Sequence, residues 1–308
     1  MSEQKSALVG LLGVSLLWGC NYVASAYLLH FFSPIFLSFA RISMTSIFLF
    51  VIALKAKGLR RPTKKEWILL GGAGIFGTLF NQIFYFTGLR DSTAANAALI
   101  IAMAPIATTI LERIFLKVPF TVPKTIGALF SLAGVVVIVG LQGQSFGVSI
   151  GDVYLVFAML ALSISLLFIR GLTNTMSSYA VTIFATILGS ILMAPAAAGE
   201  ALLGKSVVSH QVFAWILMGL AGIVAQGMAG FWWNRGVSLI GAGTASMFMN
   251  IPPFIALLLG HFALGDAIYT TQILGGVLVL LGVFVANQGA LRSPKVSPVA
   301  EKKIAQSL

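Results

Sequence analysis

Long runs of apolar side chains alternate with short polar breaks along the chain. A helix rises about 1.5 Å per residue, so roughly 20 apolar residues cross the hydrocarbon core of a bilayer. Runs of sufficient length lie at residues 7–29, 35–54, 67–89, 93–116, 124–141, 151–170, 178–200, 212–234, 243–264 and 271–289. Polar or helix-stopping residues, such as Ser33-Pro34, separate them. The pattern predicts an all-α membrane protein with ten transmembrane helices.

The composition agrees with lipid as the solvent. Of the 308 residues, 58% are hydrophobic and only 9% are charged, and the mean hydropathy is +1.00. A water-soluble domain carries about 25% charged residues, so the composition excludes that class. A single cysteine, Cys20, excludes a disulfide framework and a zinc or iron–sulfur site built on cysteine. We expect no cofactor.

The positions of Lys and Arg predict the orientation of the chain. With the loops assigned alternately to two sides, sixteen of the 19 basic residues share one side, Arg90 and Lys205 lie on the other, and Arg41 lies within a span. The positive-inside rule then places both termini in the cytoplasm. We expect the protein to lie in the cell inner membrane. The basic loop at 55–65 either only reflects this orientation or also contacts anionic lipid, and the sequence favours neither interpretation. Nucleic-acid binding is not expected.

An internal repeat relates the two halves of the chain at a shift of 148 residues. The shift places Trp67, Gly74, Gly88, Ala94, Ala97, Pro105, Gly127 and Gly134 on Trp215, Gly222, Gly236, Ala242, Ala245, Pro253, Gly275 and Gly282. Each repeat holds five predicted crossings, and this odd number gives the repeats opposite orientations. We therefore expect two inverted five-helix repeats, at 6–141 and 150–290, and a basic cytoplasmic tail at 291–308. Secondary transporters are built this way, with the substrate site near the midplane between repeats.

Several residues together resemble a module of a known family. They are Leu17-Trp18-Gly19-Cys20-Asn21-Tyr22, Arg41, Gly88-Leu89, Ala94, Ala97, Pro105, Glu112, Gly127 and Gly134. This pattern resembles the EamA module of the drug/metabolite transporter superfamily, and the second half resembles the module again. The resemblance implies a ten-helix exporter of small metabolites, with the YddG-like exporters of aromatic amino acids as a subgroup to consider. The second half departs from the family at Leu264-Gly265-Asp266, where members often carry Glu, and it lacks a Trp-Gly pair in its first helix.

Amide and aromatic residues share the glycine-rich faces of the third and eighth predicted helices. Asn81 and Tyr85 lie on the third helix, and Gln226 and Trp233 lie on the equivalent face of the eighth. An unpaired amide in lipid costs several kcal/mol by estimate, so these side chains face protein or water. They either hydrogen-bond across helix interfaces or line a central cavity and bind substrate. The pseudosymmetry of their positions favours the cavity.

The first helix supplies a second group of candidates for binding substrate. Trp18 and Tyr22 are one turn apart with Asn21 beside them, at a depth beyond the usual aromatic belt. They form either a cavity wall or ordinary core packing. Met103, Met247 and Met249 add adaptable apolar surface, although methionine is more often packing filler.

Asparagine and proline recur together in the fourth and ninth helices. Asn96 precedes Pro105, and Asn250 precedes Pro252 and Pro253. Because proline removes a backbone donor and frees a carbonyl, the three prolines are candidate hinges. The two asparagines are candidates for binding substrate.

Arg41 is the one basic residue inside a predicted span, about seven residues from the outer end of the second helix. A charge at a helix centre costs about 2.5 to 3.5 kcal/mol on an insertion scale. No Asp or Glu lies at matching depth in an obvious partner helix. We expect Arg41 either to reach outward to water or to offer its planar fork to a carboxylate.

The acidic and histidine residues restrict the mechanism. None of the eight Asp and Glu residues lies at the midpoint of a span, so proton coupling through a buried acid is disfavoured, and facilitated diffusion or exchange is expected. Glu112 or a histidine would otherwise carry protons. His30, His210 and His261 are far apart in sequence, so neither a metal site nor a catalytic dyad is indicated.

These features lead to one main hypothesis and its alternatives. We expect a monomeric carrier that exports small metabolites, most simply amino acids, by alternating access. A neutral cavity of amides and aromatic rings would suit molecules whose charges cancel internally. A drug, nucleoside or nucleotide-sugar transporter of the same fold is the alternative. An intramembrane enzyme would need clustered nucleophiles or acids, and a channel would need a charged ring or a carbonyl filter.

Overall fold

Helices make up nearly all of this computed structural model, which describes residues 3–55, 60–116, 122–142, 145–146, 149–173, 175–230, 232–233 and 247–292. The first half contains α1 (Glu3–Leu28), α2 (Pro34–Lys55), α3 (Lys64–Gly74), η1 (Ile75–Phe80), α4 (Asn81–Arg90), α5 (Ala94–Ile101), α6 (Ala104–Leu116) and α7 (Val122–Gly140). The second half contains α8 (Ile150–Thr173), α9 (Ser178–Leu202), α10 (Val212–Gly222), η2 (Ile223–Met228), η3 (Met247–Asn250), α13 (Pro252–Leu259), η4 (Gly260–Leu264) and α14 (Thr270–Arg292). The predicted helical class is confirmed apart from one hairpin.

That hairpin lies between the two halves. Strand β1 (Leu141–Gln142) pairs antiparallel with β2 (Ser145–Phe146), so that Leu141 is opposite Phe146. The polar Gln142-Gly143-Gln144 segment ends the apolar run, and the backbone groups on either side of it pair with each other in place of a helical ladder. The hairpin thus lies at a connection between two apolar runs and leaves the helical class of the fold unchanged.

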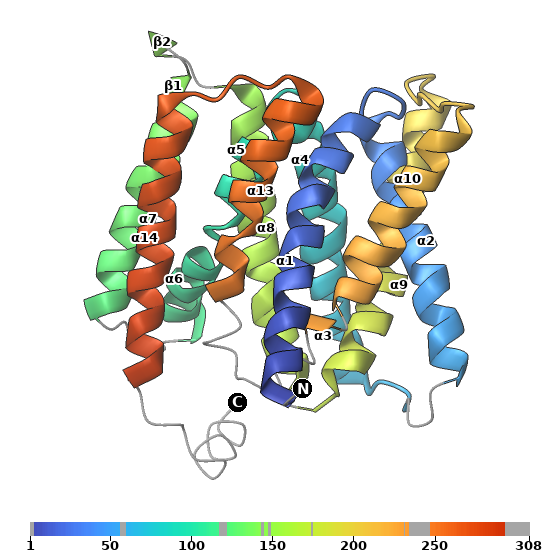
Figure 1. The fold of residues 1–308 in the computed structure, drawn as a ribbon. Coiled ribbons are helices and arrows are strands. Elements are labelled where there is room, and N and C mark those ends of the chain that lie inside the picture. The colour runs from blue at the N-terminus through green and yellow to red at the C-terminus, as the bar shows by residue number, and fades with distance from the viewer. Residues whose placement is uncertain are drawn as a thin grey trace.

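The helices are long, apolar and roughly aligned along one direction (Figure 1). Six helical stretches of the described chain have the length and hydropathy of membrane spans: Leu8–Leu28, Pro34–Leu54, Lys64–Arg90, Ala94–Phe115, Ile150–Thr173 and Tyr179–Leu202. Four shorter apolar helices are Thr125–Ile138, Val212–Met228, Pro252–Leu264 and Thr270–Val285. Large apolar side chains cover the outside, with Ile68 73% exposed and Phe262 80% exposed. Lipid can cover such a surface, whereas water would make it an aggregation site.

The two repeats exchange their first helices. Helix α8, at the start of the second half, packs against α3, η1, α4, α5 and α6 of the first. Helix α1 packs against α10, η2 and α13 of the second half. We call α3, η1, α4, α5, α6 and α8 the first bundle, and α1, α10, η2, η3 and α13 the second bundle. Each bundle therefore combines segments from both sequence repeats.

The 148-residue shift also relates the backbone geometry of the two halves. The π-helical turns η1 and η2 interrupt the third and eighth apolar runs, and a shift of 148 places Ile75–Phe80 on Ile223–Met228. π-helical turns are rare and occur frequently at functional sites. The repeat partners Gly236, Ala242 and Ala245, and residues 293–308 of the predicted tail, lie outside the described residues.

The fourth and ninth apolar runs are broken helices, close to the predicted hinges. The fourth divides at Ala102 and Met103, just before Pro105, into α5 and α6. In the ninth, Pro252 and Pro253 occupy the first turn of α13, where the missing N–H costs little, and η3 precedes them. The prolines thus lie where helices begin, and their role as hinges stays a prediction.

Helices α7 and α14 pack closely against each other and run antiparallel. A Cβ at Gly275 would lie 2.7 Å from the carbonyl oxygen of Gly134, and a Cβ at Gly282 would meet the backbone of Gly127. The hydroxyl of Ser131 donates to the carbonyl of Val279 at 3.1 Å. Glycine permits this contact because the backbones touch directly. Since α7 and α14 are equivalent under the shift, two equivalent helices lie in opposite directions.

Candidate functional site

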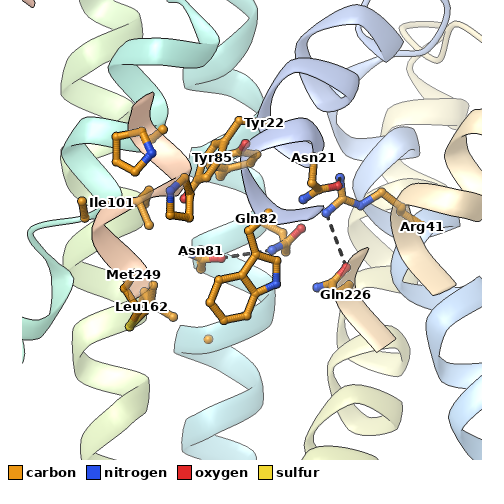
Figure 2. A pocket seen from close by; sticks show the side chains of 16 residues that line it. Asn21, Tyr22, Arg41, Asn81, Gln82, Tyr85, Ile101, Leu162, Gln226 and Met249 are labelled. Carbon is orange, nitrogen blue, oxygen red and sulfur yellow. Dashed lines mark hydrogen bonds between the residues drawn. The ribbon is translucent and has the colours of Figure 1, made fainter. Parts of the chain in front are cut away.

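A cavity of about 330 Å³ lies between the first and second bundles (Figure 2). The first bundle lines it with Gly77, Asn81, Gln82, Tyr85, Ala98, Ile101, Ala102 and Leu162, and the second with Trp18, Asn21, Tyr22, Gln226, Met249, Pro252 and Pro253. Helix α2 adds Arg41. Two walls that belong to different bundles thus enclose one polar and aromatic space.

The structure brings most of the predicted site residues together here. Trp18, Asn21, Tyr22, Arg41, Asn81, Tyr85, Gln226, Pro252 and Pro253 all line the cavity. The described lining does not include Asn96, Met103, Pro105 or Trp233, and the side chain of Asn250 lies outside what the structure describes. Whether the lining residues bind substrate stays a prediction.

The two amides of the first bundle follow directly from the π-helical turn. Asn81 and Gln82 are the first residues of α4, immediately after η1. The Asn81 Nδ2 donates to the carbonyl of Ala158 at 2.9 Å, and the Gln82 Nε2 donates to Asn81 Oδ1 at 3.1 Å. Asn81 therefore combines the two positions considered from the sequence: it hydrogen-bonds across the interface between α4 and α8, and it also lines the cavity.

Aromatic side chains line the cavity beside the amides. The indole Nε1 of Trp18 donates to the carbonyl of Ala225 in η2 at 3.1 Å, and its ring lies 5.1 Å from that of Trp233. Trp233 therefore packs against Trp18 and does not itself belong to the described lining of the cavity. The rings of Tyr22 and Tyr85, one from each bundle, also line the cavity, and their centres lie 6.2 Å apart.

Arg41 points inward, and the expectation that it reaches outward is wrong. Its side chain is only 4% exposed. The Nη1 donates to Ser25 Oγ at 2.6 Å and to Asn21 Oδ1 at 3.4 Å. The Nη2 donates to Gln226 Oε1 at 3.4 Å (Figure 2). The guanidinium carbon lies 5.2 Å from the ring centre of Phe86. These neutral acceptors satisfy part of the hydrogen-bonding capacity of the guanidinium. The side chain therefore does not have to extend to the membrane surface.

The charge of Arg41 has no acidic partner among the described residues. The ion pairs found there join Arg60 to Glu66, Arg90 to Asp91, and Arg170 to Glu112. The Nε of Arg41 is buried and lacks a hydrogen-bond partner. The expected neutral cavity is therefore corrected to one whose described lining carries a single positive charge.

Asn96 belongs to a different polar cluster. Its Nδ2 donates to both carboxylate oxygens of Asp152 at 3.1 and 3.2 Å, and its Oδ1 accepts from Gln272 Nε2 at 2.8 Å. Asp152 is fully buried, although its place at the edge of an apolar run predicts a flanking residue. Asn96 thus connects α5, α8 and α14, and its position does not support the predicted contact with substrate.

Met103 lines a separate apolar cavity of about 290 Å³ between α6, α7 and α8. Its neighbours there are aliphatic residues, such as Ile106 and Leu129. Met103 is therefore placed among packing residues and away from the polar cavity.

Sequence reasoning missed several lining residues. Gln82 could have been found, because it is a second amide inside an apolar run where an amide is costly. Gly77 lies on the glycine-rich face of the third predicted helix, where a small residue indicates close helix packing and not a cavity wall. Ala98, Ile101, Ala102 and Leu162 give no signal, because apolar residues within a span look alike whether they face lipid or a cavity. Within the described ranges, no three His, Cys, Asp or Glu residues gather as a metal site would require.

Comparisons with known proteins agree with this architecture. The sequence profile of the EamA-like transporter family matches residues 5–140 and 149–288. An uncharacterized transporter of Bacillus subtilis, YyaM, is 27% identical over 96% of this chain and 97% of its own length. A "probable terminal-alkyne amino-acid exporter" of Streptantibioticus cattleyicolor is 24% identical over 83% of this chain and 84% of its own. A crystal structure that covers 94% of this chain and 99% of its own superposes with a TM-score of 0.64 at 20% identity, a likeness of fold alone.

Proposed function

Since this chain belongs to the EamA-like transporter family, as its sequence predicts, we propose that it carries small metabolites with a carboxylate group, most simply amino acids, out of the cell. The family and the relatives named above are transporters and not enzymes. The observation that carries the proposal is the buried Arg41 guanidinium, which faces the cavity without an acid in the described chain to neutralise it.

A carboxylate is the group that best complements Arg41. Burying a charge without a partner is unfavourable, and an arginine fork binds a carboxylate through strong, charge-assisted hydrogen bonds. The two 3.4 Å contacts to Asn21 and Gln226 are at the long end of the hydrogen-bond range, so they are weak and replaceable. A cargo carboxylate can take their place, while the 2.6 Å bond to Ser25 keeps the guanidinium in position.

The remaining wall suits the rest of an amino acid. The ammonium group would find amide and hydroxyl oxygens and the faces of Trp18, Tyr22 and Tyr85, which attract cations. An aromatic or aliphatic side chain would contact the same rings and Met249. The volume is near the lower end of ligand pockets, about 300 to 1,000 Å³, and favours a small cargo. A nucleotide sugar would need more than one cation for its phosphates, so the single basic residue of the described lining favours amino acids.

We infer ten membrane crossings, arranged as two inverted repeats with both termini in the cytoplasm of a cell whose inner membrane holds the protein. The antiparallel contact of α7 with α14 supports the inversion, since these helices are equivalent under the repeat. Alternating access would then come from rocking of the two bundles around the cavity between them. The absence of an acid in the described lining favours transport without proton coupling.

The proposed topology is tested by single cysteines introduced at Ser149 and Thr270 after Cys20 has been replaced. Both positions should react with a membrane-impermeant thiol reagent from outside intact cells, because each joins two crossings at the outer face. A matched cysteine at Lys64 should react only after the cells are opened. Labelling of Ser149 and Thr270 from opposite sides would refute the inverted arrangement.

The proposed function is tested in proteoliposomes that contain the purified protein. A panel of amino acids, nucleosides and sugars is offered with and without an imposed pH gradient. We expect uptake of some amino acids, with little dependence on the gradient, and we expect Asn81→Ala to lower it without loss of expression. Strict dependence on the gradient would reject uncoupled transport, and uptake of nucleosides or sugars alone would reject the proposed cargo.

A further inference from the structure

The positive charge of the cavity should slow the return of the carrier after it has released its cargo. Arg41 faces three neutral acceptors, Ser25, Asn21 and Gln226, and the described chain gives it no acidic one. On this basis, and on the carboxylate cargo proposed above, we propose that the protein is an exchanger, in which a carboxylate must occupy the cavity for the two bundles to rock efficiently.

Transport requires a step in which the cavity closes. When the two bundles pass between inward-open and outward-open states, the cavity must lose contact with bulk water. Solvent is then excluded from the cavity, and electrostatic interactions around Arg41, itself only 4% exposed, become stronger in the drier space. The guanidinium already has one buried donor, Nε, without a partner. Closing the empty cavity therefore leaves a poorly compensated cation in the interior.

Cargo removes this cost. A carboxylate on Arg41 gives the guanidinium the anionic partner that it lacks, and charge-assisted hydrogen bonds of this kind are the strong ones. The cargo ammonium is held separately by the oxygens and aromatic rings of the lining. The loaded carrier therefore closes more readily than the empty carrier. A difference equal to one such bond slows the return of the empty carrier by roughly tenfold or more. Cargo on the far side should then accelerate uptake, because it provides a fast route for the return.

Gln226 offers the sharpest test, because its Oε1 lies 3.4 Å from the Arg41 Nη2. Gln226→Glu changes one amide to a carboxylate of almost the same shape and provides a permanent partner for the guanidinium. Gln226→Met removes the same contact at similar volume without adding charge. If charge compensation controls the return, only the glutamate variant should allow the empty carrier to return quickly.

The experiment measures uptake of radiolabelled L-phenylalanine, which has a carboxylate and an aromatic ring, into proteoliposomes. The vesicles are either empty or loaded with unlabelled L-phenylalanine, and the ratio of the two initial rates at saturating label reports trans-stimulation. We expect a ratio of about ten for the parent protein and for Gln226→Met. For Gln226→Glu we expect a ratio near one, together with a higher KM because the new carboxylate competes with cargo.

Arg41→Lys keeps the charge and should keep the high ratio, which provides a second variant if the glutamate protein folds poorly. A parent ratio near one would overturn the exchange proposal, as would an unchanged ratio in Gln226→Glu. Equal loss of stimulation in the glutamate and methionine variants would also overturn it, because the contact and not the charge would then be responsible. A parent protein that moves L-phenylalanine without trans-stimulation contradicts exchange alone, whereas one that moves no carboxylate at all contradicts the proposed function.

Discussion

Replacement of Arg41 by methionine should separate binding from stability. The variant removes one hydrogen bond of 2.6 Å to Ser25, two of 3.4 Å to Asn21 and Gln226, and the contact with the Phe86 ring. The short bond to a charged group is worth about 1.5 to 3 kcal/mol, and the long ones contribute little. Methionine also removes a charge whose insertion costs about 2.5 to 3.5 kcal/mol.

These two contributions to the free energy of unfolding nearly cancel. We therefore expect the Tm of purified Arg41→Met to stay within a few degrees of the parent, since about 1 kcal/mol moves Tm by only a few degrees in a protein of this size. Loss of the bond to a cargo carboxylate should in contrast weaken binding by about 10-fold to 150-fold, which corresponds to about 1.5 to 3 kcal/mol.

The two quantities are measured by thermal unfolding in detergent and by the KM for amino-acid uptake in proteoliposomes. Arg41→Lys is the matched control, because it keeps the charge but loses the planar fork, and it should show an intermediate KM. If Arg41 were half of a buried structural ion pair, its removal would cost about 3 to 5 kcal/mol and lower Tm by far more. Either that large drop in Tm or an unchanged KM would refute the assignment of Arg41 to cargo.

Three further predictions address the scaffold around the cavity. Gly134→Ala should lower stability by about 1 to 3 kcal/mol, because its Cβ would meet the backbone of Gly275 in α14, whereas Gly13→Ala, which meets nothing within 4 Å, should leave Tm unchanged or slightly raised. Asn96→Ala should lower stability by about 1 to 3 kcal/mol, because it removes hydrogen-bond donors from the buried carboxylate of Asp152. The KM should stay unchanged because Asn96 does not line the cavity, and a raised KM would contradict this placement. Burial raises the pKa of the Asp266 carboxyl above its value in the unfolded chain, so the folded state retains the proton more strongly and stability falls as pH rises through that interval. Asp266→Asn should therefore raise Tm at pH 7 more than at pH 4, and equal shifts at both pH values would count against the effect.

Much of the fold can be predicted from the sequence, because lipid tolerates few alternatives. An apolar run of about 20 residues must form a helix to satisfy its own backbone, so the hydropathy pattern locates the helices. The 148-residue repeat is equally informative, since the same shift relates the π-helical turns Ile75–Phe80 and Ile223–Met228. The breaks inside the runs are harder to predict. In the fourth run Pro105 marks the region of the break, because it has no N–H to donate to the carbonyl four residues earlier, but the break itself falls at Ala102 and Met103, two residues that favour helix.

The candidate site shows where sequence reasoning stops. Asn81 and Asn96 are both amides within apolar runs, and their cost in lipid marks both as paired or wet. Only the packing distinguishes them. Asn96 meets Asp152 because α8 approaches α4 closely, and a Cβ at Gly88 would lie 2.6 Å from the carbonyl oxygen of Gly151. This approach buries an acid that its position at the edge of a run would place near water.

The symmetry of the scaffold and the asymmetry of its charge have different roles. In the proposed alternating-access cycle, two equivalent bundles would give a cavity whose two sides open in turn, and this requires that the halves be alike. The shift of 148 places Arg41 on Gly189, so the second repeat has no matching cation. Gly189 is instead covered closely by the Thr78 side chain, which leaves no room for an arginine at that position. One carboxylate is therefore enough to pair with the single guanidinium of the described cavity, and a second cation by symmetry would call for a second carboxylate on the cargo.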